Sequence, residues 1–293
     1  MNTYDFITVG NYTKDTIVSA AGTRHVDGGG YNYAAHAARL AGLRVAAVTR
    51  RAAQDAAVTA PLTAAGIDVF AFDSPSSTLM RLEYPTANVD ERILSVAGVA
   101  NPIGPEHLEG LSAHTFLVTA SIRGEVSPAT VQAMKDRSWR LALDVQGFVR
   151  VVSPEGRLCY EAWPERELVL GMTDILKTDA VEAEFLTGTA DIHEAARRLA
   201  ALGPSEVVLT HKDGLLVLAE GRYHEAGFFP SELRGRSGRG DTCVGSYASY
   251  RLSADPAQAT RWAAAVTSLK LEAEGPIRRT RAEVERLLRE RYA

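Results

Sequence analysis

The sequence predicts an α/β fold, in which a mostly parallel central sheet carries helices on both faces. Two observations predict it. Short apolar runs typical of buried strands alternate with alanine-rich runs typical of helices. Glycines such as Gly42 and Gly66 follow the helical runs, where glycine favours a helix end. At 293 residues, 46% of them hydrophobic, the chain can bury the core of one large α/β domain or of two small ones, and we expect a single domain over residues 1–293.

The first part of the chain sets the alternation of strand and helix. Residues 6–9 form an apolar run that predicts a buried strand, and residues 45–48 predict the next strand. A helical pattern follows each strand, at 33–40 and at 56–65. This order is typical of a parallel sheet, because each helix returns the chain to the edge where the next strand begins.

The alternation breaks between residues 77 and 98, after a linker-like stretch at 74–77. Residues 78–84 and 91–96 alternate apolar and polar side chains around a turn at 85–88, so each strand should have one wet face. Together with a strand within 16–26, they predict a small β lid outside the main sheet. An ordinary edge hairpin is the alternative.

The second half of the chain resumes the α/β rhythm. Apolar runs predict strands at 115–118, 140–143, 175–177 and 206–210, and a late antiparallel hairpin at 215–218 and 223–225. Helical patterns occupy 242–250, 257–273 and 281–291. Asp255 and Pro256 supply a cap and a first-turn proline for the second of these helices.

Composition excludes several classes of function. With 32 basic and 36 acidic residues mixed along the chain, there is no basic footprint for nucleic acid. Cys159 and Cys243 lie too far apart for a metal motif and indicate no disulfide framework, which suits a reducing cytosol. The first residues lack a signal-peptide pattern, and no apolar run is long enough for a membrane span. We therefore expect a cytoplasmic protein with a small-molecule partner and no nucleic-acid or membrane partner.

The most informative stretch is Ser237 to Gly245. Gly238, Arg239 and Gly240 stand at a predicted helix start, where backbone N–H groups and the helix dipole can bind an anion. Asp241 beside that anion site can take a proton from a hydroxyl. Together they predict the minimum apparatus for moving a phosphoryl group onto an alcohol. The alternatives are a plain turn and a capping aspartate.

The segment Gly238–Asp241 resembles the Gly-Ala-Gly-Asp signature of ribokinase-like (PfkB) sugar kinases. Three further landmarks follow the family's order: Gly10 to Asp15, the glycine-rich loop Gly28–Asn32, and Asp179–Glu182 ahead of Leu186-Thr187-Gly188. The resemblance covers almost the whole chain. It implies a ribokinase-like three-layer sandwich with a β lid, and ATP-dependent phosphoryl transfer with Mg²⁺ and Asp241 as the base. Such lids often meet a partner's lid, so a homodimer is an expectation.

The chain departs from the family pattern at three positions. Arg239 replaces a small residue, Asp179 stands where asparagine is commoner, and Gly29 stands where ribokinases often carry lysine. Arg239 is either an extra cation for the phosphates or a solvent-facing side chain. Residues 144–150, Asp-Val-Gln-Gly-Phe-Val-Arg, are similar to a segment of myo-inositol kinases in this superfamily. The substrate expected from that similarity is a cyclic polyol, with myo-inositol first.

Candidate substrate groups lie in two segments. Carboxylate and amide side chains suit a polyol because they accept and donate hydrogen bonds in fixed directions. Residues just beyond a predicted strand are well placed, because α/β sheets bind ligands at strand carboxyl ends. Asn32 is alternatively a helix cap, and Arg150 either meets phosphate or pairs with Asp144. The substrate candidates are Asp15, Gly29, Gly30, Asn32, Asp144, Gln146 and Arg150.

The resemblance also assigns the donor end. Thr210, Lys212 and Gly214 match the family's nucleotide loop, although Lys212 stands where that loop usually has its first glycine. The same comparison places Lys177 and Asp179 by the ATP. Asp179 and Glu182, three residues apart, are the candidates for holding Mg²⁺, mostly through waters. A solvated acidic helix start is the alternative.

Other classes of nucleotide enzyme fit less well. There is no Gly-x-x-x-x-Gly-Lys-Ser/Thr loop, and the glycine run is not Gly-x-Gly-x-x-Gly. Two alternatives stay open. A nucleoside kinase of the same fold would use an aromatic sandwich, for which Tyr12, Tyr31 and Tyr33 are available. A sugar-binding regulatory protein would have lost turnover.

Overall fold

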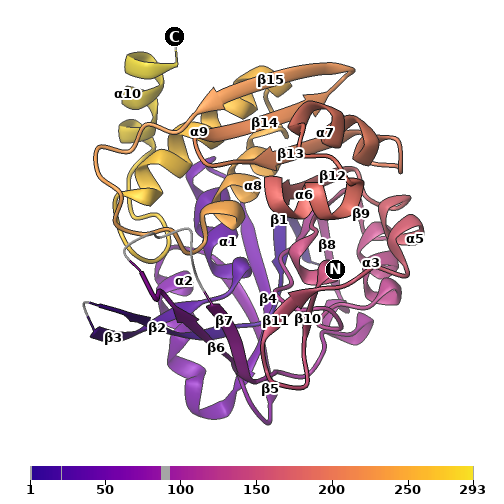
Figure 1. Ribbon diagram of the computed structural model, residues 1–293, viewed down its shortest axis with the longest axis vertical. Coiled ribbons are helices and arrows are strands. Elements are labelled where there is room, and N and C mark those ends of the chain that lie inside the picture. The colour runs from indigo at the N-terminus through magenta and orange to yellow at the C-terminus, as the bar shows by residue number, and fades with distance from the viewer. Residues whose placement is uncertain (1, 21, 87–92, 293) are drawn as a thin grey trace.

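The computed structural model describes residues 2–20, 22–86 and 93–292. Within them, the centre is a nine-stranded sheet in the order β15-β14-β13-β12-β9-β8-β1-β4-β5 (Figure 1). Neighbouring strands from β13 to β5 run parallel, and β14 and β15 join as an antiparallel hairpin. The strands are β1 (Asn2–Val9), β4 (Val45–Ala52), β5 (Asp68–Ser74), β8 (Leu111–Val118), β9 (Ser138–Asp144), β12 (Ile175–Asp179), β13 (Glu206–Thr210), β14 (Gly214–Ala219) and β15 (Arg222–Gly227).

Helices cover both faces of this sheet (Figure 1). One face packs against α3 (Pro128–Lys135), α5 (Arg166–Leu170), α6 (Ala180–Thr187) and α7 (Ile192–Ala200). The other packs against α1 (Gly30–Leu40), α2 (Ala60–Ala64), α8 (Arg239–Tyr250) and α9 (Pro256–Leu271), with α10 (Arg281–Arg291) on α9. The predicted three-layer α/β sandwich is confirmed.

Strand β1 shows why its sequence lacks polar alternation. Ile7 and Val9 point into one buried cluster, whereas Phe6 points into the cluster on the opposite face. The strand lies between β4 and β8 and pairs with both in parallel, with Phe6 opposite Val45 and Thr115. A strand covered on both faces reads as a continuous apolar run.

A second sheet of four strands lies apart from the main sheet, in the order β3-β2-β6-β7 (Figure 1). Its strands are β2 (Thr13–Ser19), β3 (Gly22–Gly28), β6 (Thr78–Glu83) and β7 (Ile93–Gly98), and we call it the small sheet. Its place outside the main sheet confirms the prediction for these segments. The region predicted as one strand within 16–26 is in fact a hairpin of two. Residues 87–92, which include the second half of the predicted turn and the start of the second predicted strand, lie outside the described residues.

Several boundaries differ from the sequence prediction. Helices α1 and α8 begin at Gly30 and Arg239, so both glycine-rich segments lead into, and partly form, a first helical turn. The helix predicted over 56–65 is a 3₁₀ helix, η1 (Ala53–Thr59), followed by the short α2. Pro61 in the first turn of α2 explains the break, because proline cannot donate the hydrogen bond of a helix interior.

Further short elements complete the fold. After β9 come α4 (Gln146–Val149) and a two-stranded hairpin of β10 (Arg150–Val152) and β11 (Leu158–Tyr160), and η2 (Pro105–Leu108) precedes β8. Among the helices of the described residues, none has the length and apolar character that crossing a membrane requires.

Candidate active site

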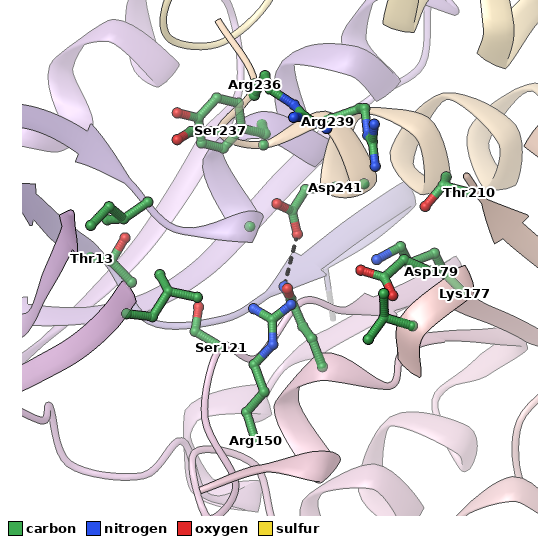
Figure 2. A pocket seen from close by; sticks show the side chains of 18 of the residues that line it. Thr13, Ser121, Arg150, Lys177, Asp179, Thr210, Arg236, Ser237, Arg239 and Asp241 are labelled. Atoms are coloured by element: carbon green, nitrogen blue, oxygen red, sulfur yellow. Dashed lines mark hydrogen bonds between the residues drawn. The ribbon is translucent and has the colours of Figure 1, made fainter. Parts of the chain in front are cut away.

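A cavity of about 690 Å³ lies outside the carboxyl ends of β9, β12 and β13 (Figure 2). This is the edge at which open α/β sheets bind ligands. The small sheet forms one wall, and the first turns of α1 and α8 form another. Of the residues predicted as site residues, the lining includes Asp15, Gly29, Gly30, Gln146, Arg150, Lys177, Asp179, Thr210, Lys212, Gly238, Arg239, Gly240 and Asp241.

The two glycine-rich segments meet at this cavity. A Cβ added to Gly30 would lie 2.4 Å from Oδ1 of Asp241, so no other residue fits without displacing the carboxylate. Gly238 is the N-cap of α8 and has a φ of 75°, a conformation that favours glycine. A Cβ there would also meet the Tyr33 ring at 2.2 Å. The starts of α1 and α8 are therefore packed together at backbone distance.

Asp241 lies in the first turn of α8, in the middle of the cavity (Figure 2). Its Oδ1 accepts a hydrogen bond of 3.2 Å from Nε2 of Gln146. Burial raises the pKa of Asp241, although the cations Lys177 and Arg150 oppose that rise. A raised pKa makes an aspartate a stronger base toward a hydroxyl proton. Gly238, not Asp241, occupies the N-cap position, so the carboxylate is not the residue that caps this helix.

Beneath the glycines lies a buried group of charges. Nζ of Lys177 is 3.0 Å from Asp144 and 3.8 Å from Glu182, and Arg150 is 2.9 Å from Glu182. Burial alone would lower the pKa of Lys177, but Asp144 and Glu182 outweigh it and hold that pKa above its usual value. A Cβ on Gly240 would lie 2.7 Å from Nζ of Lys177. A positive charge therefore lies directly behind the turn that is predicted to bind an anion.

Asp179 and Glu182 form a reciprocal cap at the start of α6. Oδ1 of Asp179 accepts from the N–H of Glu182 at 2.8 Å, and Oε2 of Glu182 accepts from the N–H of Asp179 at 2.9 Å. Glu182 is fully buried, so the start of α6 is not the solvated acidic turn considered above.

The fit of Mg²⁺ follows from these contacts. Both oxygens of Glu182 are used, by Arg150 and by the Asp179 N–H, so Glu182 does not fit as a direct ligand. Asp179 lines the cavity. In the part of the chain that the structure describes, no three His, Cys, Asp or Glu side chains form a metal-binding group. Mg²⁺ fits here only when held mainly by waters and phosphate oxygens, with Asp179 nearby.

Four predicted site residues do not line the cavity. Asn32 lies buried in the first turn of α1, and its Oδ1 has no hydrogen-bond partner among the described residues. Asp144 and Glu182 lie beneath the cavity, where Asp144 forms an ion pair with Lys177 and Glu182 forms one with Arg150. Gly214 pairs with Gly227 in the main sheet, and a Cβ there would meet the Ala226 carbonyl oxygen at 2.4 Å, which explains the glycine.

Sequence reasoning missed an apolar wall and two basic residues. The small sheet contributes Met80, Leu82 and Leu94 to the lining, and the alternating pattern of those strands was the signal that one face is covered. His211 and Arg236 also line the cavity. Burial lowers the pKa of His211, which favours its neutral form.

Comparisons with known proteins identify the family and the fold. The family described as pfkB family carbohydrate kinase matches residues 1–282. A search of curated proteins returns no match. A solved pyrophosphate-dependent kinase in the ribokinase family, in complex with a pyrophosphate analogue and myo-inositol, is 29% identical with a TM-score of 0.88, over 96% of this chain and 99% of that one.

Two further structures extend the comparison. One is a pyrophosphate-dependent myo-inositol-1 kinase that was converted into a myo-inositol-3 kinase by replacing an asparagine and a serine with leucine. It is 29% identical to this chain with a TM-score of 0.88, over 98% of this chain and 100% of that one. Arabidopsis thaliana ribokinase with ribose and ATP shares the fold at 18% identity and a TM-score of 0.75, over 98% and 99% of the two chains. Since the family match spans nearly the whole chain, the protein belongs to the pfkB family of carbohydrate kinases and is a carbohydrate or polyol kinase.

Proposed function

We propose that this protein transfers a phosphoryl group to a hydroxyl of a cyclic polyol, with myo-inositol as the preferred acceptor and pyrophosphate as the preferred donor. The observation that carries the proposal is that Asp241 lines one cavity together with the polar residues Asp15 and Gln146, which suit the acceptor, and the basic residues Lys212 and Arg239, which suit the donor. The solved kinase with a pyrophosphate analogue and myo-inositol supports the same pair of substrates.

The chain's own groups account for the chemistry. The acceptor hydroxyl oxygen forms the new bond to phosphorus, the bond from phosphorus to the bridging oxygen of pyrophosphate breaks, and phosphate leaves. Asp241 takes the hydroxyl proton. The N–H groups at the start of α8 and the ammonium of Lys177 stabilise the charge of the transferring group. Mg²⁺, when bound beside Asp179, supplies further neutralisation of phosphate charge.

The lining of the donor end bears on the choice between pyrophosphate and ATP. The apolar lining residues Met80, Leu82 and Leu94 belong to the small sheet, at the acceptor side. Thr210 is the last residue of β13, and His211 and Lys212 follow it at the donor side. Polar and basic side chains bind phosphate oxygens well, so His211 and Lys212 support pyrophosphate. Ala180 and Val181 give the same end a small apolar surface that a purine can contact. ATP, the donor implied by the family resemblance, is the second candidate.

Two leucines bear on which hydroxyl reacts. Leu82 and Leu94 are direct cross-strand partners of β6 and β7, and both line the cavity. In the converted relative, two substitutions to leucine changed a 1-kinase into a 3-kinase. Leucine side chains offer no hydrogen bonds to the ring hydroxyls, so an apolar pair at this wall favours a ring orientation in which those hydroxyls bind polar groups elsewhere in the cavity. We infer that this chain phosphorylates the 3-hydroxyl of myo-inositol.

The three tyrosines considered for a nucleoside kinase do not form an aromatic sandwich around the cavity. Tyr12 and Tyr31 are buried in the core, and the hydroxyl of Tyr12 donates to Asp27. Tyr33 lines the cavity. Of the three tyrosines considered, Tyr33 alone lines the cavity, so these three do not form the two-sided stack that a base requires. The other tyrosine of the lining is Tyr160, at the end of β11.

Turnover with matched donors tests the proposal. Purified protein with Mg²⁺ receives pyrophosphate or ATP and one of myo-inositol, ribose, fructose, adenosine or cytidine, and ³¹P NMR follows the products. We expect the highest kcat/KM with pyrophosphate and myo-inositol. A far higher kcat/KM with adenosine or cytidine establishes the nucleoside kinase. Calorimetric binding of polyol without turnover from either donor establishes the regulatory protein.

The identity of the product tests the leucine pair. The 1- and 3-phosphates of myo-inositol are mirror images, so chiral chromatography is required to separate them. We expect the 3-phosphate from the wild type and a shift toward the 1-phosphate from Leu82→Asn with Leu94→Ser. Leu168→Ser, at an exposed position on α5, is the control and should leave the product unchanged. An unaltered product ratio in the double variant contradicts the assignment.

A further inference from the structure

Lys270, near the end of α9, is a buried lysine that the chemistry above does not use. Its side chain is 1% exposed, and Nζ donates a 2.7 Å hydrogen bond to the carbonyl oxygen of Gly235. The ammonium also lies 5.4 Å from the centre of the Tyr33 ring. Removing an ammonium from water is costly unless other interactions offset it. The hydrogen bond to one backbone carbonyl does not by itself explain why a charged lysine is buried here.

The bonded carbonyl belongs to the loop that becomes the anion-binding turn. The N–H groups of Arg234 and Gly235 donate to the carbonyl of Leu271 at 2.9 and 3.0 Å. The end of α9 therefore binds this loop twice, through the loop's N–H groups and, by Lys270, through the carbonyl of Gly235. Three residues later, Gly238 caps α8 with its left-handed backbone against the ring of Tyr33. The position of Gly235 therefore sets where the N–H groups of the turn point.

We propose that Lys270 is a positioning residue for phosphoryl transfer: its ammonium holds the Gly235 loop, and through it the turn Gly238–Asp241, and places a positive charge behind that turn. The proposal rests on the proposed function, because it assigns a role in that reaction. A displacement of about 1 Å in such a turn is enough to cost about 100-fold in rate.

Charges from several elements face this ammonium. Burial is the largest influence and lowers the pKa of Lys270 to about 8, with Asp241 and Glu274 acting to raise it and Arg239 to lower it. On β3, Arg24 pairs with Glu274 at 2.6 Å. A second cavity of about 320 Å³ is lined by Lys270 with Arg24, Arg234, Arg236, Glu274 and Tyr33. Lys270 is therefore charged at neutral pH and loses its proton just above it.

Two substitutions separate charge from shape. Lys270→Met removes the charge and should lower kcat about 10- to 100-fold, with the KM for polyol nearly unchanged. Lys270→Arg keeps a charge that does not titrate. The wild type should lose kcat/KM as pH rises through about 8, and both variants should lack this step. The control is Lys135→Met, which breaks a pair with Asp174 at a distance from the cavity and should leave kcat unchanged.

Chemical rescue gives an independent measurement. Lys270→Ala leaves space for a small cation, so ammonium or methylammonium chloride should restore part of kcat where sodium chloride at equal ionic strength does not. Thermal unfolding of each variant establishes that it is folded, and if Lys270→Met fails to fold, the rescue and the arginine variant decide.

The outcomes separate this inference from the proposed function. Equal kcat in the wild type and Lys270→Met overturns the role of Lys270 while the kinase stands, and so does an alkaline step near pH 8 that persists in Lys270→Arg. If the wild type turns over no substrate, the proposed function fails. Calorimetric binding of pyrophosphate then decides the inference: weaker binding by Lys270→Met supports it, and equal binding overturns it.

Discussion

At the scale of single residues, Asp241 has the surroundings of a base, because it is buried, it faces the cavity, and its one described side-chain hydrogen bond comes from the neutral amide of Gln146. Replacing the carboxylate with an amide keeps its size and removes its ability to accept a proton. Asp241→Asn should therefore lower kcat by about two to four orders of magnitude.

Binding and pH complete this prediction. Calorimetric affinities for polyol and pyrophosphate should change little in Asp241→Asn, because the amide occupies the same space. In the wild type, protonation of Asp241 as pH falls removes the base, so kcat/KM should fall on the acid side at a higher pH than an ordinary aspartate gives. Asp191→Asn at the exposed cap of α7 is the matched control. Near-normal turnover by Asp241→Asn contradicts its role as base.

Lys177 is the residue on which the buried charges depend. Lys177→Met leaves Asp144 and Glu182 without their shared cation, so we expect a loss of about 3–5 kcal/mol in the free energy of unfolding. Adding Asp144→Asn should recover part of that loss, because one stranded charge is gone. Urea unfolding measures both. A loss below about 1 kcal/mol, typical of exposed pairs, contradicts the account.

At the scale of elements, the contact between the starts of α1 and α8 brings Gly30 against Asp241, the proposed base. A Cβ at Gly30 would meet Oδ1 of Asp241 at 2.4 Å and Cβ of Thr119 at 2.7 Å. Gly30→Ala should therefore push the carboxylate away and lower kcat at least about 100-fold, with a destabilisation of about 1–3 kcal/mol from overpacking. Gly171→Ala, where a Cβ meets nothing closer than 3.2 Å, is the control, and equal kinetics of the two variants contradict this packing argument.

The elements also show what the sequence does and does not predict. Strands such as β1 are predicted correctly, because a strand buried on both faces has a distinctive apolar run. The starts of α1 and α8 are placed too late, since glycine has a poor helix propensity and tertiary packing of Gly30 and Gly240 overrides it. Met80, Leu82 and Leu94 are missed as lining residues, because alternation reveals that one face is covered and not which ligand lies against it.

For a similar reason, the sequence does not show which candidate residues line the cavity and which are buried beneath it. Motif neighbours such as Asp179 and Glu182 are read together from the sequence, yet one lines the cavity and the other points into the protein to meet Arg150. A spacing of three residues fixes a helical turn and does not fix which side chain meets solvent. Burial at that depth depends on the packing of β12 and α6, which no local pattern contains.

At the scale of the whole molecule, the buried ammonium of Lys270 makes stability depend on pH. Its pKa is lowered from 10.5 to about 8 in the folded protein, so the unfolded chain binds more protons between those values. The wild type should then gain stability relative to Lys270→Met as pH rises from about 8 to 10.5, by up to about 3 kcal/mol. Urea unfolding of both proteins across this range measures the difference. A flat difference contradicts the assigned proton.

The order of strands in the main sheet affects when turnover returns as the protein refolds. Strand β1 pairs with β4 and with β8, and the start of α1 meets the start of α8, so the proposed reacting centre joins segments from opposite ends of the chain. Contacts between residues far apart in the sequence form slowly, because closing a long loop costs entropy before the contact contributes any stabilising free energy. In refolding from urea, turnover should therefore return with the slowest phase, after the C-terminal hairpin β14–β15 has already recovered its secondary structure.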